Sequence, residues 1–182
     1  ELALNLIHFP SNNDDVKEAL RYLKYEEFLR FQLTMQYIKL SRKDNLGIKK
    51  QFNRQTLDEF IAQLPFELTF DQEQAALEVI NDLQKETMMY RFVQGDVGSG
   101  KTVVGAIGLY ANYLAGYQGA MMAPTEILAT QHYRSLIKLF KKIDINIALL
   151  TGHLSNKEKQ RIYNDLENGT IDIVVGTHAL FQ

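Results

Sequence analysis

Eight residues near the middle of the chain constrain its fold more than any other stretch. They are Gly95, Asp96, Val97, Gly98, Ser99, Gly100, Lys101 and Thr102, which fill every fixed position of the phosphate-binding pattern G-x-x-x-x-G-K-[ST]. Phe92 and Val93 before the pattern predict the end of a short buried strand, and the mostly small, apolar residues 103–113 after it predict a packed helix. A strand, a glycine loop and a helix in this order form the context in which such a loop binds phosphate.

Each residue type in this loop has a chemical reason. Gly95, Gly98 and Gly100 allow positive φ angles and a close approach of the backbone to a ligand. The freed N–H groups and the positive end of the following helix attract anionic oxygens. Lys101 supplies a mobile charge for outer phosphates, and the Thr102 hydroxyl is placed to ligate Mg²⁺. We therefore expect a site for ATP and Mg²⁺ rather than a glycine-rich turn that binds nothing.

The composition narrows the class of protein. The 182 residues suffice for one domain and part of another, and 46% hydrophobic residues can bury a core. The absence of cysteine excludes disulfides and thiolate chemistry, and the sequence has neither an apolar run of membrane-spanning length nor a signal-peptide pattern. Because the formal net charge is only −2, nucleic-acid binding would have to come from local patches and backbone amides.

The first part of the chain predicts a connection rather than a domain of its own. Residues 1–10, ELALNLIHFP, form a short apolar stretch that we interpret as the exit strand of an upstream domain. Residues 11–64 are expected to form a helical linker: capping and acidic side chains start a long helix that runs to about Leu40, and a shorter helix follows at 57–64. Residues 65–182 then carry the phosphate loop.

A capped helix is expected just before the phosphate loop. Thr69 is a good N-cap, and the helix that follows carries Gln72 in its first turn. This helix precedes the loop by about one helix length, so its start could lie beside a nucleotide base. Gln72 has the donor and acceptor that an adenine edge requires, and Phe66 or Phe70 could stack on the ring. An ordinary amphipathic helix explains the same residues equally well.

Beyond the loop, short apolar runs alternate with helical patterns. Strands are expected over residues 120–123, 145–150 and 171–175, separated by two helices. This order predicts an α/β fold: a parallel sheet covered by helices on both faces, with its functional edge at the carboxyl ends of the strands. The three later strands end at Pro124-Thr125-Glu126, Thr151-Gly152-His153 and Gly176-Thr177-His178.

These strand ends share threonine hydroxyls and backbone N–H groups near helix starts, which suit phosphate oxygens. In a single loop, threonine and glycine would more simply cap a helix or make a turn. Their recurrence in three successive loops of a sheet that also carries a phosphate loop favours a track for a nucleic-acid backbone.

The motifs GDVGSGKT, APTEILATQHY, LLTG and GTHAL, in that order, resemble the early motifs of superfamily 2 helicases, and LTFDQ resembles the motif upstream of their phosphate loop. The similarity is greatest to the RecG family of bacterial branched-DNA translocases. It covers essentially the whole chain, because ALNLIHFP and the helix containing YEEFLRFQL resemble the join between the wedge domain and the motor in that family. Transcription-repair coupling translocases, which usually have an aromatic residue where this chain has Ser99, and replication-restart helicases are the alternatives.

The resemblance implies an incomplete RecA-like motor domain over residues 65–182. It implies that residues 95–102 hold the ATP phosphates, that Thr102 holds Mg²⁺, and that Gln72 contacts adenine with Phe66 as a stacking partner. It also implies a cytoplasmic, nucleoid-associated bacterial protein whose partner is branched duplex DNA, such as forks and four-way junctions, with no membrane and no obligate protein partner. The residues that it implies for DNA contact are Pro124, Thr125, Glu126, Thr151, Gly152, Thr177 and His178.

One part of the catalytic pattern is missing from the sequence. ATP hydrolysis needs an acidic pair at the end of a buried strand, and no apolar run here ends in Asp-Glu. Asp172 precedes its strand, and Asp144 is followed by more strand. In the family that motif and a second motor domain come later. We therefore expect the chain to be a piece of a longer polypeptide that does not hydrolyse ATP alone and acts at most as a nucleotide- or DNA-binding module. A kinase or transporter ATPase would need signatures that we do not find.

Overall fold

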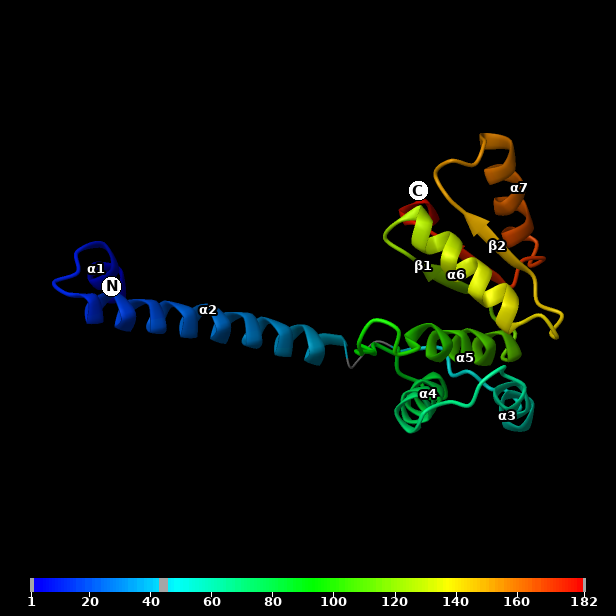
Figure 1. Cartoon of the computed structure of the whole chain (residues 1–182), viewed down its shortest axis with the longest axis horizontal. Helices are drawn as coiled ribbons and strands as arrows, with labels where there is room; N and C mark the ends of the chain where they lie inside the picture. The colour runs from blue at the N-terminus through cyan, green and yellow to red at the C-terminus, as the bar shows by residue number, and fades with distance from the viewer. Residues whose placement is uncertain (1, 43–45, 182) are drawn as a thin grey trace. The chain divides into compact units, whose positions relative to one another are not determined.

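The computed structural model describes residues 2–42 and 46–181 (Figure 1). The chain divides into two compact units, Glu1–Leu46 and Gly47–Gln182. Each unit is described by itself. Residues 1, 43–45 and 182 of the segments expected above lie outside the described part.

The first unit consists of two helices, α1 (Leu2–His8) and α2 (Asn13–Arg42). The expected strand over residues 1–10 is therefore wrong. Leu2, Ala3 and Leu6 recur at helical spacing and line one hollow with Ala19 of α2, with Ala3 and Ala19 buried, whereas a lone strand would have no partner for its backbone. The long helix is confirmed: Asn12 Oδ1 accepts hydrogen bonds from the backbone N–H groups of residues 14 and 15 at its start.

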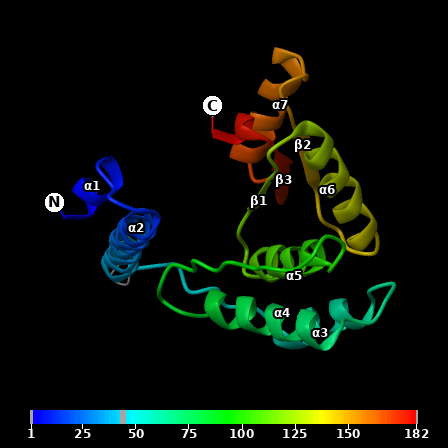
Figure 2. The same ribbon diagram turned by 60° about the vertical axis from the view of Figure 1, so that its left-hand side comes forward.

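The second unit begins with a layer of three helices, α3 (Arg54–Ala62), α4 (Phe70–Leu83) and α5 (Lys101–Leu114). Figure 2 shows α3 and α4 on one side of α5, with the sheet on the other. Leu57 and Phe60 of α3 are buried in the core of this unit. The segment expected as a helical linker over 11–64 is thus divided, because α3 packs on α5 and the boundary lies between Leu46 and Gly47.

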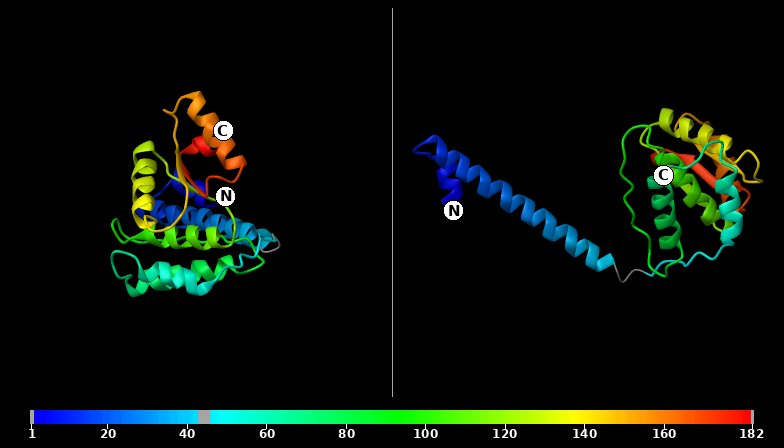
Figure 3. Two further views of the ribbon diagram at one scale, coloured as in Figure 1. Left: turned by 90° about the vertical axis from the view of Figure 1, so that its right-hand side faces the viewer. Right: turned by 60° about the horizontal axis from the view of Figure 1, so that its bottom comes forward.

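The sheet has three parallel strands, β1 (Gly119–Met122), β2 (Ile147–Leu150) and β3 (Ile173–Gly176), in the order β1-β3-β2. Gly119 and Ile147 both lie opposite Ile173, so the strands end together at one edge. The crossovers, α6 (Glu126–Leu139) and α7 (Asn156–Glu167), run in opposite directions across the sheet, so right-handed connections put them on opposite faces (Figure 3). A short 3₁₀ helix, η1 (His178–Phe181), follows β3.

The expected α/β class, with a parallel sheet between helices, is confirmed, but two strands differ from expectation. Residues 91–94 belong to no strand of the described chain, and Phe92 is 86% exposed, because the three strands pair only with one another. β1 was expected to be buried, yet Met122 is 50% exposed, as an edge strand permits. Central β3 is buried along its whole length, which explains its continuous apolar sequence.

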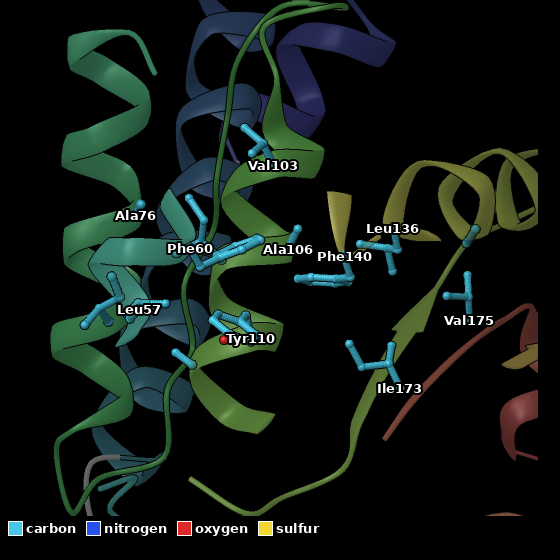
Figure 4. Close-up of a cluster of buried hydrophobic side chains, with 14 of the residues drawn as sticks. Leu57, Phe60, Ala76, Val103, Ala106, Tyr110, Leu136, Phe140, Ile173 and Val175 are labelled. Carbon is cyan, nitrogen blue, oxygen red and sulfur yellow. The ribbon is translucent and has the colours of Figure 1, made fainter. Parts of the chain in front are cut away.

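An aromatic cluster ties the helical layer to the sheet layer. The ring of Phe60 lies 4.5 Å from that of Tyr110 and 5.3 Å from that of Phe140, measured between centroids. Figure 4 shows these rings facing one another from α3, α5 and the end of α6. Such pairs add about 0.5–1.5 kcal/mol each beyond area burial. These contacts hold α5 in place, and the phosphate loop leads directly into the start of α5.

Candidate functional site

The phosphate loop is a tight turn that leads into α5. Ser99 N donates to Asp96 O at 3.1 Å, and Val103 N donates to Gly100 O at 2.9 Å. Gly98 and Gly100 have φ angles of 86° and 82°, as expected. Gly95 does not have a positive φ; its lack of a side chain instead permits a close approach, since a Cβ there would lie 2.6 Å from Ser99 Oγ.

The Lys101 ammonium group lies over this loop. Its Nζ donates to the carbonyl oxygens of Gly95 and Asp96 at 2.7 and 2.6 Å. It is also 3.4 Å from Ser99 Oγ. Thr102, next to it in the first turn of α5, is half-buried, and Val97 at the tip of the loop is fully exposed. The loop therefore combines an exposed backbone, a helix start and one positive charge, the set of groups that suits a polyphosphate.

Gln72 joins the start of α4 to the phosphate loop. Thr69 and Gln72 form a capping box in which Gln72 Oε1 accepts from Thr69 N at 3.0 Å. The other end of the same amide, Nε2, donates to Ser99 O at 2.8 Å. A Cβ on Gly100 would collide with this Nε2 atom. One open hollow is lined by residues of both segments, among them Gln72, Gly95, Ser99 and Lys101.

The aromatic residue expected beside the base lies elsewhere. Phe66 is 48% exposed and lines a separate hollow with Leu64, Pro65 and Glu73. Phe70, the alternative, is the first residue of α4 and is 73% exposed. The structure thus brings Gln72 to the phosphate loop but brings neither ring into the hollow that the two share. Asp71, which the sequence did not single out, does line that hollow.

The loops that follow β1 and β2 meet at the carboxyl edge of the sheet. Glu126 Oε2 lies 2.9 Å from His153 Nε2. A Cβ on Gly152 would lie 2.8 Å from Glu126 Oε1, so the glycine permits this approach. Lys159 Nζ donates to Gly152 O at 2.9 Å. Two segments that are far apart in sequence therefore form one polar cluster, as parallel topology predicts.

The threonines of these loops are less available than expected. Thr125 is exposed, but its hydroxyl accepts from Leu128 N at 3.3 Å as the N-cap of α6. Thr151 is only 7% exposed, because it directly follows the buried end of β2. Thr177 is half-buried, whereas Pro124 and His178 are exposed. The expectation of an exposed threonine hydroxyl in every loop is therefore wrong at Thr151.

The phosphate loop and the three strand-end loops remain separate. Within the described residues, no hydrogen bond or ion pair joins residues 95–102 directly to residues 124–126, 151–153 or 177–178. The described part of the chain also holds no group of three or more His, Asp or Glu side chains arranged to bind a metal ion. Thr102 is the residue beside the loop whose hydroxyl suits Mg²⁺, which prefers hard oxygen ligands.

The sequence reasoning missed an ion-pair cluster next to the loop. Arg91 pairs with Glu78 and with Asp82, both on α4, and Lys85 also pairs with Asp82. Hydrogen bonds from Lys85, and then from Arg91, hold the pKa of Asp82 below its usual value against the opposing effect of partial burial. The four-residue spacing of Glu78 and Asp82, which puts both on one helix face, was the signal available.

Comparison with known proteins identifies the class to which this fold and site belong. The sequence profile of the DEAD/DEAH box helicases matches residues 69–182. The chain therefore belongs to the DEAD/DEAH box helicase family.

Within that class the similarity is to one protein in particular, the ATP-dependent DNA helicase RecG. The Bacillus subtilis protein is 49% identical over 99% of this chain, and the Thermotoga maritima protein is 46% identical over 97%. The chain spans about a quarter of the length of these relatives, 26% and 23% respectively. The resemblance to RecG drawn from the motifs is thereby confirmed.

Solved structures agree. The structure of RecG bound to a three-way DNA junction covers 99% of this chain with a TM-score of 0.81 and 46% identity, and the chain covers 25% of that protein. A hypothetical ATP-dependent RNA helicase from Sulfolobus tokodaii covers 69% of this chain, with the chain covering 34% of it, at a TM-score of 0.51 and 22% identity. The second likeness shows the shared fold alone.

Proposed function

We propose that this chain is the nucleotide-binding part of an ATP-dependent DNA helicase or translocase that remodels branched DNA, including stalled forks and four-way junctions. The observation that carries the proposal is the phosphate loop with Lys101 over it and Gln72 joined to it. Similarity to RecG over nearly the whole chain, including residues before the motor motifs, favours branched DNA over the transcription-coupled alternative.

In this proposal ATP supplies the free energy for movement along DNA. The backbone N–H groups of residues 95–100 bind its phosphates, and Lys101 exchanges its contacts with Gly95 O and Asp96 O for phosphate oxygens. Thr102 provides one oxygen ligand for Mg²⁺. Gln72 would contact the adenine, and Phe66 would stack on the base only if residues 65–68 rearrange.

The strand-end loops are the proposed contacts to the DNA backbone. Pro124, Thr125 and Glu126 follow β1, and Thr151 and Gly152 follow β2. In this chain the contacts fall to the backbone N–H groups more than to the threonine hydroxyls, since Thr125 caps a helix and Thr151 is buried. Thr177 and His178 complete the proposed set.

The wider organisation is also a proposal. Residues 1–46 would connect a wedge-like DNA-binding domain to the motor, whose compact unit begins at Gly47, and the protein would act in the cytoplasm near the nucleoid. Among the described residues, no helix combines the length and apolar character needed to cross a membrane.

ATPase assays of the full-length protein that contains this chain test the proposal. We expect ATP hydrolysis to rise more with forked DNA than with plain duplex of equal length, and to be lost in Lys101→Ala. Equal stimulation by both DNAs would contradict the branched-DNA assignment. The 182-residue chain alone should not hydrolyse ATP, because it lacks an acidic pair at a strand end. DNA-stimulated hydrolysis by the chain alone that Lys101→Ala abolishes would contradict that part.

A further inference from the structure

The segment that enters the phosphate loop is held by side chains rather than by a strand ladder. Residues 88–94 belong to no strand of the described chain, although the loop that they carry needs a fixed position to bind phosphates. Arg91 lies in this segment, four residues before Gly95. It is 28% exposed and is directed toward α4.

The guanidinium group of Arg91 is held in place by two carboxylates of α4. Its Nε and Nη2 lie 2.7 and 2.6 Å from Asp82 Oδ2, and its Nη1 pairs with Glu78. Asp82 is only 16% exposed and is also bound by Lys85 at 2.7 Å. A planar guanidinium that contacts two carboxylates fixes the direction of its backbone, which a single exposed ion pair does not.

The helix on the other side of these contacts, α4, is packed into the core and contacts the loop a second time. α4 buries Ala76, Val79 and Ile80, and a Cβ on Gly108 of α5 would lie 3.0 Å from Val79 Cγ1, so α4 and α5 pack closely. The start of α4 holds the loop through the bond from Gln72 to Ser99. One helix therefore contacts the chain just before the loop and within it.

We propose that Arg91, with Glu78 and Asp82, forms a clamp that positions the phosphate loop for the nucleotide. The clamp is a positioning device, because none of the three side chains lines the hollow shared by Gln72 and Lys101. The proposal rests on the nucleotide-binding function proposed above. In this proposal α4 holds the position of the first residues of the loop through side-chain contacts, without strand pairing to the sheet.

The test compares Arg91→Gln, Arg91→Lys and Glu78→Gln/Asp82→Asn in the whole chain, with Arg54→Gln as the matched control. Arg54 also pairs with a carboxylate, Asp58, but on α3 and away from the loop. Each variant that circular dichroism shows to be folded is titrated with a fluorescent ATP analogue and Mg²⁺. We expect Arg91→Gln and the double variant to weaken binding about tenfold. Arg91→Lys should recover part of this loss, because lysine restores the charge but not the fork. Arg54→Gln should have no effect.

Amide hydrogen exchange measures the effect of Arg91 on the loop without any nucleotide, so it tests the clamp even if the chain does not bind ATP. The amides of Ser99 and Val103, which donate to Asp96 O and Gly100 O, should exchange faster in Arg91→Gln than in the unsubstituted chain without nucleotide, while the amides of α7 should be unchanged. If the unsubstituted chain does not bind the analogue, the proposed function fails but the exchange rates still decide the clamp. Unchanged loop exchange in folded Arg91→Gln, or an unchanged affinity where the chain binds the analogue, would overturn the inference.

Discussion

At the scale of single residues, the phosphate loop depends on two glycines for different reasons. Gly98 and Gly100 both have a left-handed φ, which costs other residues about 1–2 kcal/mol. A side chain on Gly98 would point into open space, whereas one on Gly100 would collide with the Gln72 amide. Gly100 thus permits the contact between α4 and the loop, and Gly98 only permits the turn.

Alanine at each glycine separates these two roles. We predict that Gly98→Ala lowers the free energy of unfolding by about 1 kcal/mol, from backbone strain alone. Gly100→Ala should cost about 0.5–1.5 kcal/mol more, because the Gln72 amide must move away from the added methyl group and loses its bond to Ser99. Urea unfolding of the two variants measures the difference. Equal losses would show that Gln72 does not hold the loop through this contact.

At the scale of elements, α4 carries both the Gln72 amide that bonds to the phosphate loop and the carboxylates that bind Arg91. The shifted pKa of Asp82 makes the stabilisation from these contacts depend on pH, and the direction of the shift means that acid weakens it. Because its pKa is held below the usual value by Lys85 and Arg91, its contribution to stability is complete above the unfolded value of about 4. That contribution is lost as the pH falls through the lower, folded-state pKa.

Asp82→Asn should therefore lower the melting temperature at neutral pH and flatten its fall in acid. Thermal unfolding followed from pH ~7 to ~3 measures both effects. Asp58→Asn is the control, since its pair with Arg54 is more exposed and is worth less in water. An acid transition of the same steepness in Asp82→Asn and in the unsubstituted chain would contradict the assigned role of Asp82.

At the scale of the whole molecule, the sequence predicts the α/β class, the long helix and the cap at Thr69, because periodicity and capping chemistry are local signals. It does not decide whether Gln72 lies near the loop: the rise of a helix per residue allows this position, but a capped amphipathic helix explains the same residues equally well. The features that it mispredicts depend on partners. Phe92 and Val93 have strand-forming side chains but pair with no described strand, and Leu2 to His8 become a helix by packing on α2.

The ion pairs of Arg91 and the contact between Glu126 and His153 could not be predicted from the sequence for a related reason. Each joins residues from different elements, and only the folded arrangement brings them together. Thr151 shows the reverse error: a hydroxyl that suits phosphate in the sequence is buried at the end of β2. The type of a residue indicates its possible chemistry, and its burial decides whether that chemistry is available.

Calorimetric titration of the whole chain with ATP and Mg²⁺ tests the central claim most directly. The phosphate loop, Lys101 and Gln72 should bind one ATP per chain. Lys101→Ala removes a charged donor worth about 1.5–3 kcal/mol, so it should weaken binding by about tenfold or more while the chain stays folded. Absence of binding by the folded, unsubstituted chain, or equal affinity in Lys101→Ala, would contradict the account.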